Sequence, residues 1–307
     1  MAKTAFVFAG QGAQYSGMGR DLYEGSPAAK AVFDQAEALR PGTKAQCFEG
    51  TPAELADTLN TQPCLFCVDL ASAYALQAGG IQPDVIAGFS LGEIAALTFA
   101  GVFDFAEGFR FVCHRAALMK AASEKNPSAM LAVLKLSGRQ VEEICGSFQE
   151  AYPVNYNSPE QTVVAIAKES QPEFSKAVQA AGGKALLLPV SGGFHSPFMN
   201  DVHTGLATAL DALELKAPGL PVYANLNAEP YGRSIKETLA DQVNHPVQWQ
   251  RSVEAMAAAG AGTFIEVGAG KILTGLIRKI VPEVRALNVE DMTGVAAAQA
   301  LWAIDRQ

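Results

Sequence analysis

The hydrophobic positions of this chain alternate between short apolar runs and longer segments with helical spacing. In the first 127 residues, strands are predicted at 5–9 and 84–87, and helices at 32–39, 63–79, 93–97 and 105–122. Glycines close the long helix at 79–80, just before the second strand. Short buried strands that alternate with helices are typical of a parallel sheet covered by helices. The amino-terminal part is therefore predicted to be an α/β unit.

The pattern changes between residues 128 and 191. Strands are predicted at 130–134, 154–157, 162–166 and 185–188, and helices at 139–148 and 171–181. Their order, βαββαβ, indicates a ferredoxin-like insert. Strands at 221–224 and 262–267 and a helix at 272–280 then return to the larger body. We expect a catalytic subdomain resembling the α/β-hydrolases over 1–127 and 192–307, a ferredoxin-like subdomain over 128–191, and an active-site cleft between them.

Composition narrows the class of protein. Of 307 residues, 49% are hydrophobic and 18% charged, which favours a compact enzyme over a disordered chain. The formal charge of −8 disfavours nucleic-acid binding, because phosphate contacts need a basic surface. No apolar run reaches membrane-spanning length and no signal peptide is evident, so neither a membrane partner nor export is expected.

The five cysteines are odd in number and irregularly spaced, which is typical of reduced thiols in a cytoplasmic protein. Cys64 and Cys67 have the spacing of a metal or redox pair. They lack a second pair and lie in an apolar helix, so buried core thiols are the favoured interpretation, and no metal site is predicted.

The segment Gly88-Phe89-Ser90-Leu91-Gly92 carries the clearest chemical signal. It follows a buried strand and precedes a helix, as a nucleophile elbow does. The glycines permit a sharp turn, and the helix start directs N–H groups and a positive dipole end toward the Ser90 hydroxyl. These features predict a serine that becomes acylated.

A nucleophilic serine needs a base, and the chain offers His114, His195, His203 and His245. Only His195 lies in a glycine-rich irregular segment where the two subdomains meet, so it is favoured, although spacing alone leaves the others open. No carboxylate is obvious as a third member. The pattern indicates a Ser-His dyad whose imidazole is held by a neutral acceptor. The glycines of Gly268-Ala269-Gly270 lack the full spacing of a phosphate loop and predict a close-packed turn.

Six segments, in order, resemble the malonyl-CoA:acyl carrier protein transacylases and the related acyltransferase domains of polyketide synthases. They are Phe8 to Gln14, Gly88 to Glu93, Arg115 to Met119, Phe194 to Ser196, Asn244 to Trp249 and Glu266 to Lys271. The resemblance spans nearly the whole chain.

This resemblance implies a role for particular residues. Ser90 would be the acylated nucleophile and His195 the general base, with the main-chain carbonyl of Gln248 holding its imidazole. The main-chain N–H groups of Gln11 and Leu91 would form the oxyanion hole, where each donor contributes about 3 kcal/mol.

Three further residues are implied to bind substrate. Arg115 would pair with the free carboxylate of the malonyl group, since a guanidinium matches a carboxylate in a bidentate fashion. Without the resemblance, a surface helix residue is the favoured interpretation of Arg115. Met119 belongs to the same motif, and Phe194 matches the form of the histidine loop that accompanies malonyl selection.

The sequence departs from the family pattern at three positions. Phe89 stands where the family usually has histidine, which removes a polar group beside the serine. Because that histidine is not the base, we expect activity to survive. Ala9 and Ala269 stand at positions that are often proline, and both changes are conformationally undemanding.

The implied activity is ping-pong transfer of malonyl from malonyl-CoA to the phosphopantetheine thiol of acyl carrier protein, supplying fatty-acid elongation without a cofactor. Lys271, Arg278 and Lys279 are the candidate docking residues for the acidic carrier protein, and a merely solvated helix face is the equal alternative. A trans-acting polyketide acyltransferase, a serine thioesterase or hydrolase, and a non-catalytic acyl-binding protein are the competing functions.

Overall fold

The computed structural model describes residues 2–304, and its larger body is built on a five-stranded parallel sheet. The strand order is β7-β2-β1-β8-β9, and the strands are β1 (Lys3–Phe8), β2 (Val85–Gly88), β7 (Val222–Tyr223), β8 (Ala261–Val267) and β9 (Arg285–Val289). Phe8 pairs with both Gly88 and Val267, so the carboxyl ends of the three central strands meet at one edge. Ligand sites of open parallel sheets lie at this edge.

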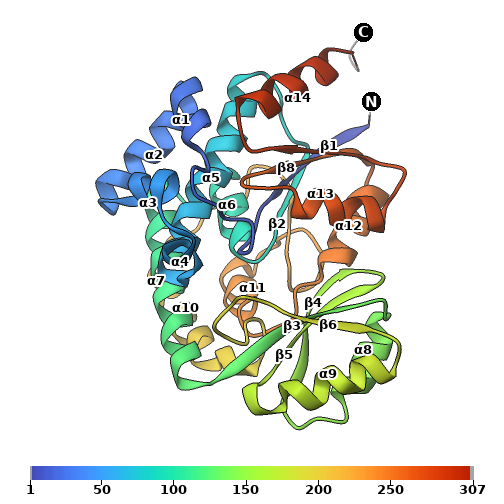
Figure 1. Cartoon of the computed structure of the whole chain (residues 1–307). Coiled ribbons are helices and arrows are strands. Elements are labelled where there is room, and N and C mark those ends of the chain that lie inside the picture. Colours follow the sequence, from blue (N-terminus) through green and yellow to red (C-terminus); the bar gives the residue numbers. More distant parts are fainter. Residues whose placement is uncertain (1, 305–307) are drawn as a thin grey trace.

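Helices cover both faces of this sheet (Figure 1). The larger body contains these helices, some of which pack only on other helices: α1 (Arg20–Gly25), α2 (Pro27–Leu39), α3 (Thr43–Glu49), α4 (Pro52–Ala56), α5 (Thr58–Ala78), α6 (Leu91–Phe99), α7 (Phe105–Lys125), α10 (Asn200–Asp211), α11 (Ile235–Asp241), α12 (Trp249–Ala258), α13 (Ile272–Ile280) and α14 (Met292–Ile304).

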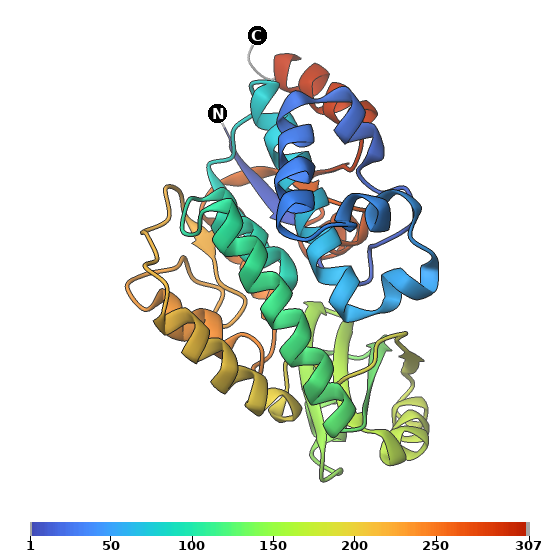
Figure 2. The ribbon, with the colours of Figure 1, turned by 90° about the vertical axis from the view of Figure 1, so that its left-hand side faces the viewer.

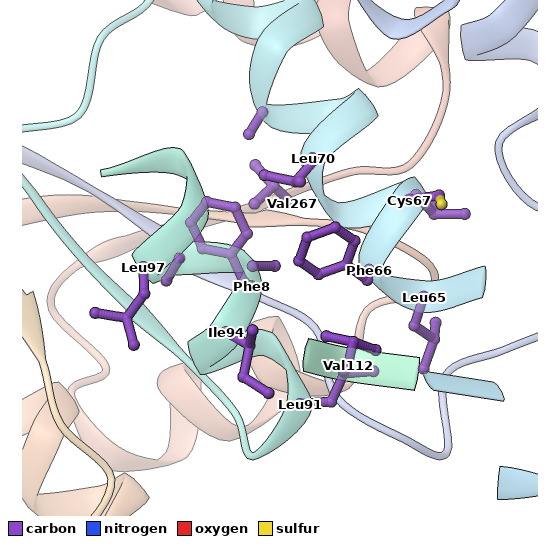
Figure 3. Packing of buried hydrophobic residues seen from close by; sticks show 14 of the residues in the cluster. Phe8, Leu65, Phe66, Cys67, Leu70, Leu91, Ile94, Leu97, Val112 and Val267 are labelled. Carbon is purple, nitrogen blue, oxygen red and sulfur yellow. The ribbon is translucent and has the colours of Figure 1, made fainter. Parts of the chain in front are cut away.

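Alternate residues of β1 point to opposite faces, as the pleat of a strand requires. Phe6 and Phe8 join the larger core cluster with α5 and α6, whereas Ala5 and Val7 join a second cluster with α12 and α13. Figure 3 shows the larger cluster, where Phe8 packs among side chains of α5, α6 and α7. α5 is apolar on nearly all sides because it lies between the sheet and α2 and α7. This packing explains the buried free thiols of Cys64 and Cys67, as predicted.

A separate four-stranded antiparallel sheet forms the smaller body at the lower end of the molecule in Figure 1. Its order is β4-β5-β3-β6, and its elements are β3 (Ser128–Leu134), α8 (Gly138–Cys145), β4 (Ala151–Ser158), β5 (Gln161–Ala167), a 3₁₀ turn (Lys168–Ser170), α9 (Gln171–Ala180) and β6 (Lys184–Leu187). Helices α8 and α9 cover one face through an apolar cluster. The predicted fold class is confirmed, with its βαββαβ insert. The exact division at 127/128 and 191/192 stays a prediction.

The two bodies are joined in three places. Helix α7 runs from the large body to the start of β3 (Figure 2). The chain returns after β6 through an irregular segment and a 3₁₀ turn, Pro197–Met199. The N–H of Tyr156 in β4 donates to Val247 O, and Val247 N–H donates to Val154 O. The smaller sheet lies beside the carboxyl edge of the parallel sheet, where residues after β1 and β2 and residues of β3, β4 and β5 line one cavity.

The sequence pattern did not predict β9, nor the helices α1, α3, α4, α11, α12 and α14. The turn at Gly268 to Gly270 is close-packed, as predicted: both glycines have positive φ, and a Cβ on Gly268 would lie 1.9 Å from Asp69 Oδ1. No helix of residues 2–304 is long and apolar enough to cross a bilayer.

Candidate active site

Ser90 lies in the turn between β2 and α6. Its backbone has φ 54° and ψ −104°, a conformation that few non-glycine residues adopt. A Cβ on Gly88 would lie 1.9 Å from the carbonyl carbon of Gly92, and one on Gly92 would lie 2.3 Å from Phe8 O. Both glycines are therefore required by the tight packing of this elbow. The turn holds Ser90 at the amino end of α6, where the helix dipole is positive.

His195 lies beside Ser90 although 105 residues separate them in sequence. Its Nε2 is 2.7 Å from Ser90 Oγ, and its Nδ1 is 2.8 Å from the main-chain oxygen of Gln242. Since a carbonyl oxygen only accepts, Nδ1 carries the proton and Nε2 keeps a lone pair for the Ser90 hydroxyl. Burial, and then the charge of Arg115, lower the pKa of His195 to about 3. The imidazole is therefore neutral at physiological pH.

The acceptor predicted for this imidazole, the main-chain carbonyl of Gln248, is wrong. Gln248 precedes α12, and its carbonyl accepts from the N–H and the hydroxyl of Ser252 in the first turn of that helix. Gln242 follows α11, at a helix end whose carbonyl groups lack helical partners. The Gln242 carbonyl can therefore accept from His195.

The other three histidines lie elsewhere. His203 Nε2 is 2.9 Å from Asp241 Oδ1, and His245 Nδ1 is 2.9 Å from Asp241 O. His114 is exposed on α7. Of the four, only His195 borders the cavity that contains Ser90.

Arg115 is buried on α7, with 2% of its surface exposed, so it is not a surface helix residue. Its Nη1 donates to Gln62 Oε1 at 2.8 Å, and its Nη2 donates to Ser90 Oγ and Gln242 Oε1, both at 3.1 Å. All three acceptors are neutral oxygens, and Arg115 forms no ion pair with any residue of 2–304. Burial lowers the pKa of Arg115 to about 10, which leaves it charged at pH 7. The site thus holds a buried cation that has no carboxylate within hydrogen-bond distance among residues 2–304, and Glu93 acts on it only at longer range.

A buried carboxyl group, Glu93, lies behind this cation. Its Oε1 accepts from Tyr231 OH at 2.5 Å and from Asn225 N–H at 3.1 Å, and its Oε2 accepts from Gln242 Nε2 at 2.7 Å. Burial raises the pKa of Glu93 to about 7. Gln242 Nε2 also donates to Ser90 O at 2.7 Å. Gln242 therefore contacts Ser90, Arg115 and Glu93 through its side chain and His195 through its carbonyl.

Sequence reasoning missed four residues of this network: Gln62, Asn225, Tyr231 and Gln242. Amides and tyrosines in loops or inside apolar helices have no spacing that marks them. Only the position of each side chain in space distinguishes them from structural residues.

The main-chain N–H groups of Gln11 and Leu91 border the same cavity. Gln11 follows β1 by three residues and Leu91 begins α6. Within residues 2–304 neither N–H donates a hydrogen bond, whereas Ser90 N–H donates to Asn225 Oδ1 at 2.7 Å. Two unused donors therefore lie beside Ser90, at the ends of adjacent strands.

The cavity has a volume of about 590 Å³ and takes its walls from both sheets. Met119 and Phe194 line it beside Arg115 and His195, and both are buried. Phe89 forms an apolar wall, since its ring lies edge-on to Trp249 at 5.4 Å between centroids and against Gly10. The described residues contain no group of three or more His, Cys, Asp or Glu side chains arranged to hold a metal ion.

Helix α13 joins this cavity to the surface. Ile272, Leu273 and Leu276 line the cavity, and Lys271 precedes them at the start of the helix. Lys271, Arg278 and Lys279 are exposed, as a docking surface requires, and Arg278 Nη2 also donates to Ala286 O at 2.9 Å.

Comparison with known proteins matches residues 5–299 to the acyl transferase domain family. The malonyl CoA-acyl carrier protein transacylase of Bacillus subtilis (strain 168) is 36% identical over 299 residues, covering 95% of this chain and 94% of its own. That of Escherichia coli (strain K12) is 39% identical over 310 residues, covering 98% and 100%.

Solved structures agree with these relatives. The malonyl CoA-acyl carrier protein transacylase of Clostridium perfringens is similar with a TM-score of 0.95, at 32% identity over 99% of this chain and 98% of that one. A malonyl-transacylase solved in complex with its holo type II PKS acyl-carrier protein has a TM-score of 0.94, at 34% identity over 97% and 99%.

Proposed function

The chain belongs to the acyl transferase domain family, and we propose that it transfers malonyl from malonyl-CoA to the phosphopantetheine thiol of an acyl carrier protein, supplying fatty-acid elongation. One observation supports malonyl as the acyl group. The buried Arg115 guanidinium lies 3.1 Å from Ser90 Oγ and forms no hydrogen-bonded ion pair with a carboxylate of residues 2–304. A malonyl thioester has a carboxylate one methylene from its reacting carbonyl, so it would bring the missing negative charge to Arg115 as it meets Ser90. An acetyl group brings none.

The first half-reaction follows from the Ser90 and His195 geometry. Ser90 Oγ attacks the thioester carbonyl while His195 Nε2 takes the hydroxyl proton. The Gln11 and Leu91 N–H groups stabilise the oxyanion, since both are unused by the protein. The tetrahedral intermediate collapses, the C–S bond breaks, and His195 returns the proton to the departing coenzyme A thiolate.

The second half-reaction reverses these roles. The carrier protein thiol attacks the malonyl-serine ester, His195 takes the thiol proton, and Ser90 leaves and regains a proton from His195. The carbonyl of Gln242 keeps the imidazole in the required tautomer throughout. This chemistry requires no metal or prosthetic group on the transferase itself.

We assign both halves to one cleft between two subdomains, 1–127 with 192–307 and 128–191. The larger contributes Ser90, His195 and Arg115, and the smaller contributes Asn155, Asn157 and other wall residues of the cavity. The carrier protein would dock beside α13 through Lys271, Arg278 and Lys279, because that helix borders the cavity. The cytoplasmic location expected from the cysteines stays a prediction.

Intact-mass spectrometry after mixing with malonyl-, methylmalonyl- or acetyl-CoA tests the function. A malonyl adduct is expected on the wild type and none on Ser90→Ala. A stable adduct that transfers to holo carrier protein separates a transacylase from a thioesterase, which would lose the acyl group to water. Lack of any malonyl adduct on folded wild-type protein would overturn the assignment.

A further inference from the structure

One buried amide side chain spans the elbow that carries Ser90. Asn225 is 1% exposed and lies two residues after β7. Its Oδ1 accepts from Ser90 N–H at 2.7 Å, and its Nδ2 donates to Gly88 O at 2.6 Å. The residues before and after Phe89 are thus tied to a single side chain.

The Asn225 side chain hydrogen-bonds to main-chain groups of the elbow just beyond the point where the pairing of β2 with β7 ends. The β2–β7 pairing ends at Ala87 and Tyr223, because the chain then turns sharply to reach the positive φ of Ser90. On the β7 side, Gly88 O and Ser90 N–H would be left without a main-chain partner, although Gly88 still pairs with Phe8 of β1. A donor and an acceptor on one amide replace that partner, and only one orientation of the amide satisfies both.

The main chain of Asn225 is itself fixed on both sides. Its N–H donates to Glu93 Oε1 at 3.1 Å, and its carbonyl accepts from Gln248 N–H at 2.8 Å. Glu93 is held in turn by the Tyr231 hydroxyl. Every polar group of Asn225 is therefore engaged, which leaves its side chain a single position.

We propose that Asn225 is a positioning residue for acyl transfer, which holds the Ser90 backbone in the strained conformation that directs Oγ at His195. The positive φ of Ser90 is disfavoured for a non-glycine residue and persists only where its surroundings impose it. Because Asn225 accepts a hydrogen bond from the Ser90 N–H, that N–H is not free to bind the oxyanion. The main-chain N–H groups of Gln11 and Leu91 stay available for it. This inference rests on the proposed function.

Phenylmethylsulfonyl fluoride tests the positioning role of Asn225 separately from malonyl transfer. Ser90 would attack the sulfur of this reagent and expel fluoride without using Arg115. We expect Asn225→Ala to lower both the rate constant of sulfonylation and the kcat of malonyl transfer by about 100-fold, as a misplaced reacting atom does. The KM for malonyl-CoA should change less than threefold, because Arg115 and the cavity walls remain. Asn227→Ala, at an exposed asparagine of the same hairpin, is the matched control and should match wild type.

Asn225→Asp gives a readout that a structural role would not produce. Its protonated carboxyl can donate to Gly88 O as the amide does, so its sulfonylation rate should recover at least tenfold as the pH falls from 8 to 5.5. Asn225→Ala should show no such recovery. If Asn225→Ala does not fold, the Asp variant and Tyr231→Phe, which loosens the support through Glu93, carry the test.

Folded Asn225 variants with wild-type sulfonylation rates, or with a raised KM and unchanged kcat, would overturn the inference. A wild type that is sulfonylated at Ser90 but never takes a malonyl group would instead overturn the proposed function.

Discussion

Replacing Arg115 with methionine should make His195 more basic by removing the nearest positive charge. Ser90 Oγ is 2.7 Å from His195 Nε2 and 3.1 Å from Arg115 Nη2, so the two nitrogens are at most about 6 Å apart. At an effective dielectric constant of about 20, unit charges at that distance interact by about 3 kcal/mol, equivalent to about two pH units. Burial still disfavours the imidazolium. The pKa of His195 should therefore rise from about 3 to about 5.

Sulfonylation of Ser90 by phenylmethylsulfonyl fluoride measures this change, because only neutral His195 can take the serine proton. Glu93, with a pKa of about 7, is protonated below about pH 6, so between pH 6 and pH 4.5 the wild-type rate constant should stay flat, since its histidine remains neutral there. In Arg115→Met it should fall on acidification with a midpoint near pH 5. Arg110→Met, an exposed arginine on the same helix, should retain the flat profile. A flat profile for a folded Arg115→Met would refute this electrostatic coupling.

Three other predictions concern selectivity, docking and stability. Arg115→Ala should lower kcat/KM for malonyl-CoA at least tenfold more than for acetyl-CoA, and an equal loss of both would deny it a selecting role. Reversing Arg278 and Lys279 to glutamate should raise the KM for carrier protein about tenfold and leave that for malonyl-CoA unchanged; the exposed Lys176→Glu is the control, and parallel effects on both substrates would contradict docking on α13. Burial, and then repulsion from Glu266, raise the pKa of Asp69 well above its usual value, and a hydrogen bond from the Ala9 main chain only partly opposes this. The folded state therefore retains a proton that the unfolded chain loses above about pH 4, and stability falls as pH rises. Asp69→Asn should stabilise the protein more at pH 7 than at pH 4 in urea unfolding, and a difference independent of pH would contradict the assignment.

The elements that the sequence predicted well are those whose signal is local. The strand, turn and helix around Ser90 lie within about 15 consecutive residues. Gly88 and Gly92 are required there because a Cβ on either would lie less than 2.5 Å from neighbouring main-chain atoms. The ferredoxin-like insert was also predictable, because each of its strands has an apolar face and clear turns. β9 and α14 were missed, since their small and mixed residues give weak periodicity.

The supporting residues of the site could not be predicted, because their function depends on contacts between distant segments. Asn225 and Glu93 are 132 residues apart, and Gln242 and Glu93 are 149 apart. The error at Gln248 has the same origin. Gln242 and Gln248 each adjoin a helix end near His245. Which of them accepts the hydrogen bond from His195 depends on the direction of its main-chain carbonyl. That direction depends on where α11 ends and α12 begins, which a sequence pattern defines only to within a residue or two.

The neutral acceptor on His195 has a consequence for the acyl group that the site accepts. A carboxylate at the position of the Gln242 carbonyl would stabilise the imidazolium and offset the charge of Arg115, whatever the substrate. With a carbonyl there, the positive field of Arg115 opposes protonation of His195 until another negative charge arrives. Under the proposed function, a malonyl carboxylate on Arg115 would supply that charge and so would make the base stronger at the moment when Ser90 must lose its proton. An acetyl thioester would bring no such charge, so that only Glu93 would offset Arg115 and the base would stay weaker. On this proposal, selection of the acyl group and activation of the serine would depend on the same ion pair, which would explain why a Ser-His pair without an acid suits this site.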